Sequence, residues 1–118
     1  MSEVAITRAE WLHVCKRSDL VANSGVCALV GGRQIALFFL PDQEPQLYAI
    51  DNWDPIADVG VISRGIVAEI GGELTVASPL YKQHYRLTDG QCLEKAEYKL
   101  VTYPIAFEGD DVLIQIDH

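Results

Sequence analysis

Basic residues are scarce in this sequence of 118 residues. It holds nine lysines and arginines against 17 aspartates and glutamates, so its formal net charge at pH 7 is −8. The few cations do not cluster along the chain, whereas nucleic acids and anionic membranes attract clustered positive charge. We therefore expect no nucleic-acid partner and no membrane partner.

Long hydrophobic runs are also missing. The longest covers residues 35–40, which is six residues, whereas a membrane-spanning helix needs about 20. Near the start of the chain, Glu3, Arg8 and Glu10 interrupt the apolar stretch that a secretory signal would need. These two absences predict a cytoplasmic protein.

Cysteine is sparse and widely spaced. The three residues Cys15, Cys27 and Cys92 are an odd number, which argues against a disulfide scaffold and predicts free thiols. Zinc and iron–sulfur sites need four ligands, usually in two close pairs, and only His13 lies near a cysteine. We therefore expect no metal site. A metal or redox protein that uses Cys15, Cys27 or Cys92 remains an alternative.

Motifs for catalysis are absent as well. The sequence has no Gly-x-Ser-x-Gly segment, and its two Gly-Gly pairs, at 31–32 and 71–72, lie between apolar runs and not ahead of a helix. Glycines in that position form turns and do not cradle phosphate. Composition and spacing thus predict no catalytic residue and no cofactor bound by this chain.

What recurs is a short apolar run followed by turn residues. Residues 26–40 and 66–77 each read as two strands joined by a Gly-Gly turn. Residues 85–93 read as a shorter pair, and residues 100–116 as two further strands around an acidic turn. This pattern predicts an all-β fold, a small sandwich or barrel, in a single domain over residues 1–118.

The start of the chain is ambiguous. Residues 7–10 match a capping box, which begins a helix, but residues 11–15 fit a strand equally well. Residues 17–20 predict one helical turn. Helix is otherwise not expected.

Two segments are long for loops in so small a domain. Residues 51–65 and 77–85 each begin at the end of a predicted strand, with a polar residue close to a proline. Long loops on a rigid scaffold often carry function. The alternative is structural: Asn52 and Asp54 would form turns, and Trp53 would cover the end of a barrel.

These loops resemble the two cluster-binding loops of Rieske domains, in which Cys-x-His and Cys-x-x-His hold two irons. Here Asn52-Trp53-Asp54 and Ser78-Pro79-Leu80-Tyr81 stand at the corresponding places. The resemblance implies a small Rieske-like β-sandwich or barrel with two long loops at one end. It also implies that Asn52, Asp54, Ser78 and Tyr81 occupy vestigial ligand positions and bind no iron–sulfur cluster.

Several short sequence segments resemble those of the small subunits of assimilatory NAD(P)H-dependent nitrite reductases. They are Gly25-Val-Cys-Ala-Leu29, Asn52-x-Asp-Pro55, Ser63-Arg-Gly65 and Ala77-Ser-Pro-Leu-x-Lys-Gln83. The likeness extends over residues 11–116, although His84-Tyr85 departs from the Arg-Phe that this family more often has. It implies a non-catalytic subunit. Its partner, the large subunit, carries FAD, siroheme and an iron–sulfur cluster and reduces nitrite to ammonium.

The same resemblance indicates a docking surface on the two loops. Aromatic residues are enriched at interfaces and polar ones form their rims, which makes Trp53, Arg64, Tyr81, Lys82 and His84 the candidate contacts. The alternative function is that of a cluster-free Rieske-like binding module of another oxidoreductase. We further expect Asn52 and Asp54 to bond across to Ser78 and Tyr81 in place of iron.

Overall fold

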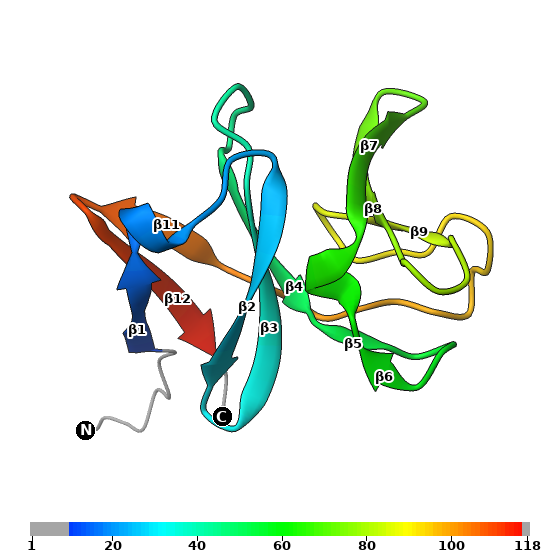
Figure 1. Cartoon of the computed structure of the whole chain (residues 1–118), viewed down its shortest axis with the longest axis horizontal. Helices are drawn as coiled ribbons and strands as arrows, with labels where there is room; N and C mark the ends of the chain where they lie inside the picture. The colour runs from blue at the N-terminus through cyan, green and yellow to red at the C-terminus, as the bar shows by residue number, and fades with distance from the viewer. Residues whose placement is uncertain (1–9, 117–118) are drawn as a thin grey trace, which may run out of the picture.

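The computed structural model describes residues 10–116, and the chain there is built almost entirely from β-strands (Figure 1). The predicted all-β fold is confirmed. In the described residues no helix is long and apolar enough to span a membrane. In chain order the elements are β1 (Glu10–Lys16), the 3-10 helix η1 (Arg17–Asp19), β2 (Ser24–Val30), β3 (Arg33–Phe39), β4 (Leu47–Asp51), β5 (Trp53–Asp54), β6 (Val59–Gly60), the 3-10 helix η2 (Ile62–Arg64), β7 (Ile66–Ile70), β8 (Glu73–Ala77), β9 (His84–Arg86), β10 (Thr102–Tyr103), β11 (Ile105–Glu108) and β12 (Asp111–Ile116).

The strands form three small sheets and one short hairpin. The sheet orders are β1-β12-β11, β10-β4-β3-β2 and β7-β8-β9, while β5 pairs with β6. In Figure 1 the sheet of β2, β3 and β4 stands in the middle, with β1 and β12 on its left and β5 to β9 on its right. The central sheet is therefore covered on both faces.

This position explains the apolar run at 35–40. Successive side chains of a strand point to opposite faces. Ile35 and Leu37 pack with Ile114 in one hydrophobic core, and Ala36 and Phe38 belong to a second core. Because both faces of β3 are buried from Ile35 onward, its sequence from Ile35 to Phe39 is apolar and does not alternate.

The two Gly-Gly hairpins are present as predicted. β2 pairs with β3 and β7 with β8, both antiparallel. Gly31 and Gly32 have φ of 57° and 80°, and Gly71 and Gly72 have 58° and 84°. Only glycine adopts these angles readily, so the glycines set both turns.

Two predictions need correction. Residues 100–107 do not form one strand: Tyr103 pairs with β4, whereas Ile105 pairs with β12, because the chain changes sheet at Pro104. The predicted pair at 85–93 is reduced to a single bridge between Tyr85 and Cys92. Proline lacks the N–H that would continue a ladder, so the pairing with β4 does not continue through Pro104.

The ambiguity at the start is resolved for the described residues. Residues 11–15 lie in strand β1, which pairs with β12. The helical turn predicted at 17–20 is confirmed as η1. The capping box begins at Thr7, and residues 7–9 lie outside the described part of the chain.

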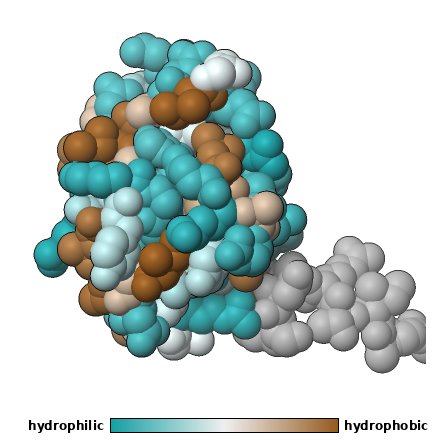
Figure 2. Space-filling model, turned by 90° about the vertical axis from the view of Figure 1, so that its right-hand side faces the viewer, coloured by the Kyte–Doolittle hydropathy of each residue, from teal (hydrophilic) through white to brown (hydrophobic). Residues whose placement is uncertain are grey.

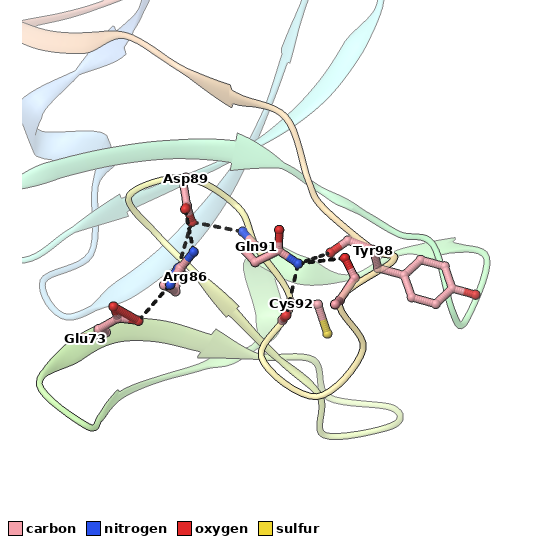
Figure 3. Close-up of polar contacts among 7 residues, drawn as sticks. Glu73, Arg86, Asp89, Gln91, Cys92 and Tyr98 are labelled. Atoms are coloured by element: carbon pink, nitrogen blue, oxygen red, sulfur yellow. Dashed lines mark hydrogen bonds and ion pairs between the residues drawn. The ribbon is translucent and has the colours of Figure 1, made fainter.

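Side-chain bonds join the irregular segment 87–99 to Arg86 of β9 and also connect residues within the segment (Figure 3). The Arg86 guanidinium donates to both carboxylate oxygens of Asp89, at 2.9 and 2.7 Å, and to Glu73 at 3.3 Å. The amide of Gln91 donates to three backbone carbonyls 3.0–3.2 Å away, those of Cys92, Ala96 and Tyr98. These contacts replace the missing strand pairing.

The ion pair gives the fold a dependence on pH. The bond from Arg86 holds the pKa of Asp89 below its usual value, so the pair stabilises the fold above the ordinary aspartate pKa of about 3.9. That stability is lost as the pH falls through the lower pKa of the folded state. We expect Asp89→Asn to lower the unfolding midpoint at about pH 6 and to have much less effect at about pH 3.

Urea unfolding at the two pH values measures this. Asp42→Asn is the matched control, since Asp42 is exposed and takes part in no ion pair within residues 10–116. An equal effect of Asp89→Asn at both pH values would contradict the assignment.

Candidate functional site

The two long loops meet at a buried carboxylate, that of Asp54. This side chain is fully buried at the end of the short strand β5. Its Oδ1 accepts hydrogen bonds from the backbone N–H groups of Ile56 and Ala57 at 2.9 and 3.0 Å. Ser78 Oγ donates to its Oδ2, and Gln83 Nε2 donates to its Oδ1 at 2.9 Å. The Asp54 carboxylate thus binds Ser78 and Gln83, which lie 24 and 29 residues further along the chain.

Asn52 closes the first loop instead of crossing to the second. It is 2% exposed, and its Oδ1 accepts from Ser63 N–H at 2.7 Å. Its amide donates to Gln34 Oε1 at 3.1 Å, which ties the loop to β3. The expected bonds between Asn52 and the second loop are therefore replaced by contacts with η2 and β3.

The second loop is a tight turn from Ser78 to Gln83. Ser78 N–H donates to the Gln83 carbonyl at 2.9 Å, and Lys82 N–H donates to the Ser78 carbonyl at 3.1 Å. The turn directs the side chains of Leu80 and Tyr81 outward, where they are 53% and 65% exposed. Tyr81 therefore does not share the buried site of Asp54 and Ser78.

Gln83 is a central residue that the sequence analysis missed. It is 4% exposed, and its amide donates both to Asp54 and to the Tyr85 hydroxyl, the latter at 3.1 Å. Its Oε1 is buried with no hydrogen-bond partner in the described residues. Burial raises the pKa of Tyr85 to about 12, so this phenol stays protonated near neutral pH. A signal was available, since Gln83 alternates with the apolar residues Tyr85 and Leu87, and all three are buried in the extended segment 83–87 around β9.

The other candidate contact residues are exposed or half-buried. Trp53 is 49% exposed, and Arg64 and Lys82 are also exposed. His84 is half-buried, and its Nδ1 lies 2.7 Å from Glu94 Oε2. Burial disfavours the charge of Glu94, but the bonds from the His84 backbone and imidazole outweigh it and hold the pKa of Glu94 below its usual value.

Small antiparallel sheets joined by loops in this order form a Rieske-like domain. The sequence profile described as "Rieske-like [2Fe-2S] domain" matches residues 10–115.

More specific relatives share the name of one enzyme subunit. The nitrite reductase (NADH) small subunit of Salmonella typhimurium is 46% identical over 95 residues, which cover 80% of this chain and 87% of that protein. The solution structure of the nitrite reductase [NAD(P)H] small subunit from Erwinia carotovora superposes with a TM-score of 0.76 at 49% identity. That match covers 92% of this chain and 82% of the other. This chain belongs to the family of nitrite reductase small subunits.

A third relative is much longer. The nitrite reductase [NAD(P)H] large subunit of Klebsiella oxytoca is 38% identical over 112 residues, which cover 95% of this chain but 11% of that protein. A segment of this larger polypeptide therefore corresponds to the chain described here.

The residues at the two loops do not fit a Rieske-type cluster. Such a cluster is held by cysteine thiolates and imidazoles. Asn52, Asp54, Ser78 and Tyr81 offer an amide, a carboxylate, a hydroxyl and a phenol, and the first three are already hydrogen-bonded. Across residues 10–116 no three His, Cys, Asp or Glu side chains are grouped to hold a metal ion.

The geometry predicts unequal effects of two substitutions. Asp54→Ala would leave two backbone N–H groups and the Gln83 amide without their acceptor, and each unsatisfied buried group costs about 1–3 kcal/mol. We expect it to lower the free energy of unfolding by more than about 3 kcal/mol, and Ser78→Ala, which removes the one side-chain donor to Asp54 Oδ2, by about 1.5–3 kcal/mol. Urea denaturation measures both.

Ser63→Ala is the matched control for Ser78→Ala. Ser63 contributes its backbone N–H to Asn52, and this bond survives the substitution. Equal losses for Asp54→Ala and Ser78→Ala would show that Asp54 is not the centre of the network.

Proposed function

We propose that this chain is the small subunit of an NAD(P)H-dependent nitrite reductase and acts by binding the large subunit. The 46% identity with the Salmonella typhimurium small subunit, over 87% of its length, carries the proposal. The match with part of the Klebsiella oxytoca large subunit supports it, because there a domain of this kind belongs to the same polypeptide as its partner.

The subunit itself is non-catalytic and holds no cofactor. Its side chains at the four vestigial ligand positions support this, since three of them already use their polar atoms within the protein. FAD, siroheme and the iron–sulfur cluster belong to the large subunit, which reduces nitrite to ammonium. The chain acts as one domain with its core over residues 11–116. Its free cysteines fit the reducing cytoplasm.

The docking surface is the end of the molecule where the two loops meet, which we call the tip. Trp53 and Tyr81 are its aromatic contacts, and Arg64 and Lys82 take part in no ion pair within residues 10–116. His84 lies at the rim with its imidazole bound to Glu94. Figure 2 looks onto this end of the molecule and shows hydrophobic areas separated by hydrophilic ones. Such a mixed surface suits a partner that contributes both apolar and polar contacts.

The backbone at the tip supports this assignment. Lys82 has φ of 64°, a left-handed conformation that glycine would adopt without strain. The sequence instead has a lysine at this exposed turn. Residues in such conformations cluster at functional sites, and this one is a cation on the proposed docking surface.

Reconstitution tests the function. The chain is co-expressed with the large nitrite reductase subunit of the same organism, and nitrite-dependent oxidation of NADH and NADPH is followed. We expect a stable complex that oxidises the nucleotide and no activity from this chain alone. Nitrite reduction by the isolated chain, or the absence of any complex, would overturn the proposal.

Truncation of the tip separates docking from stability. Trp53→Ala and Tyr81→Ala should weaken large-subunit binding at least about tenfold while costing less than about 1 kcal/mol of stability, because both side chains are half-exposed or more. Leu37→Ala is the opposite control, since Leu37 is 1% exposed and a cavity there costs about 2–5 kcal/mol. Calorimetric binding and thermal unfolding of the three variants measure the difference. Unchanged binding by both tip variants would place the docking surface elsewhere.

The isolated chain should fold without metal. Its two hydrophobic cores and the Asp54 bonds supply the stability that ligation supplies in metal-dependent domains. We expect an excess of chelator to leave the thermal midpoint unchanged and the purified protein to be colourless. A midpoint that falls by many degrees, or visible absorption from an iron–sulfur cluster, would contradict this.

A further inference from the structure

Strand β2 (Ser24–Val30) forms one edge of the central sheet, whose order is β10-β4-β3-β2. All seven residues are uncharged: Ser-Gly-Val-Cys-Ala-Leu-Val. Proteins usually protect such an edge with charged residues, proline or a covering segment, since its free backbone groups pair readily with another strand. The edge strands β1 and β7 do carry charged residues, among them Lys16 and Glu69.

The pairing of β3 shows which of its residues bond to β2. Neighbouring residues of a strand direct their backbone groups to opposite sides. Leu40 N–H donates to the Gln46 carbonyl at 2.7 Å, in the register that joins β3 to β4. Even-numbered residues of β3 therefore bond to β4, and odd-numbered ones bond to β2.

The β2–β3 register then identifies the free groups of β2. Ile35 lies opposite Ala28, and Leu37 lies opposite Val26, so the even-numbered residues of β2 bond to β3. Cys27 and Leu29 consequently direct their N–H and C=O groups away from the sheet. The Leu29 side chain is 74% exposed, and Cys27 is also exposed.

One end of this strand is covered and the other is open. A Cβ at Gly25 would lie 2.6 Å from the Ser63 carbonyl oxygen, so η2 packs closely over that end. Within residues 10–116, no backbone hydrogen bond joins the outward groups of Cys27 and Leu29 to another segment. This open part of the edge, from Cys27 to Val30, offers two N–H donors and two C=O acceptors, which an extended backbone matches one for one.

The open edge is continuous with the tip. Leu29 lies opposite Gln34 in the β2–β3 register. Gln34 accepts from the Asn52 amide at 3.1 Å, and a Cβ at Gly60 would contact the same Gln34 oxygen. On the sheet face that Leu29 shares with Gln34, one strand position therefore separates Leu29 from the loop that carries Trp53, while the free backbone groups of β2 point to the side away from β3.

We propose that β2 accepts an extended segment of the large subunit as an added strand that pairs with Cys27 and Leu29. This inference rests on the proposed function and extends the docking surface from the tip along the sheet edge. The continuity with the tip favours this occupant. A second copy of the chain fits less well, because two molecules that each carry a net charge of −8 repel one another. The segment that pairs with this edge has uncharged or basic side chains.

Amide hydrogen exchange of the isotopically labelled chain, free and with the large subunit, tests the pairing residue by residue. In the free chain, the amides of Val26 and Ala28 should exchange slowly and those of Cys27 and Leu29 quickly. In the complex, Cys27 and Leu29 should become at least about tenfold slower, which gives β2 uniform protection.

Each other outcome is informative. If the complex forms while Cys27 and Leu29 still exchange quickly, strand addition is wrong and the proposed function stands. If no complex forms, the strand addition and the proposed function are both wrong. If the two amides become protected in the free chain as its concentration rises, a second copy is the occupant and the inference is overturned.

A charged side chain on the edge provides an independent readout. Leu29→Lys should weaken large-subunit binding at least about tenfold without changing the thermal midpoint. Val101→Lys is the matched control, because Val101 is 54% exposed and precedes β10 at the opposite edge of the same sheet. Equal binding by the two variants would contradict the assignment.

Discussion

The buried carboxylate of Asp54 is the constraint on which the tip depends. A carboxylate without water is costly unless its oxygens accept hydrogen bonds, and here four donors from two loops converge on it. Two donors belong to its own turn, and the other two come from Ser78 and Gln83. Because an unpaired buried carboxylate would destabilise the fold, these hydrogen bonds hold the two loops together. In a Rieske domain, cysteine and histidine ligands hold an iron–sulfur cluster; in this chain, hydrogen bonds to Asp54 join the two loops.

The tip lies away from the sheet that holds both ends of the described residues. Those residues run from Glu10 to Ile116, which lie opposite each other in the β1–β12 ladder. In Figure 1 that ladder stands on the left, and the strands that carry the tip stand on the right.

Local patterns in the sequence were sufficient to predict the hairpins, because a Gly-Gly pair and its flanking apolar runs lie within about fifteen residues. They failed at Pro104, where the strand divides between two sheets according to partners distant in the sequence. The site shows the same limit. The sequence pointed to both loops, but not to the pairing of Asn52 with Gln34, 18 residues away, or to the role of Gln83. Such partners are determined by how the sheets pack, and no local sequence motif predicts them.

The most direct test of the account is the effect of Asp54→Asn on the tip and on binding. This substitution keeps the shape of the side chain but puts an amide donor where Ser78 and Gln83 also donate. In a labelled sample that remains folded, the backbone amide signals of Trp53 and Tyr81 should shift, those of the core residue Leu37 should not, and large-subunit affinity should fall. Unchanged tip signals together with unchanged affinity would show that Asp54 does not shape the docking surface.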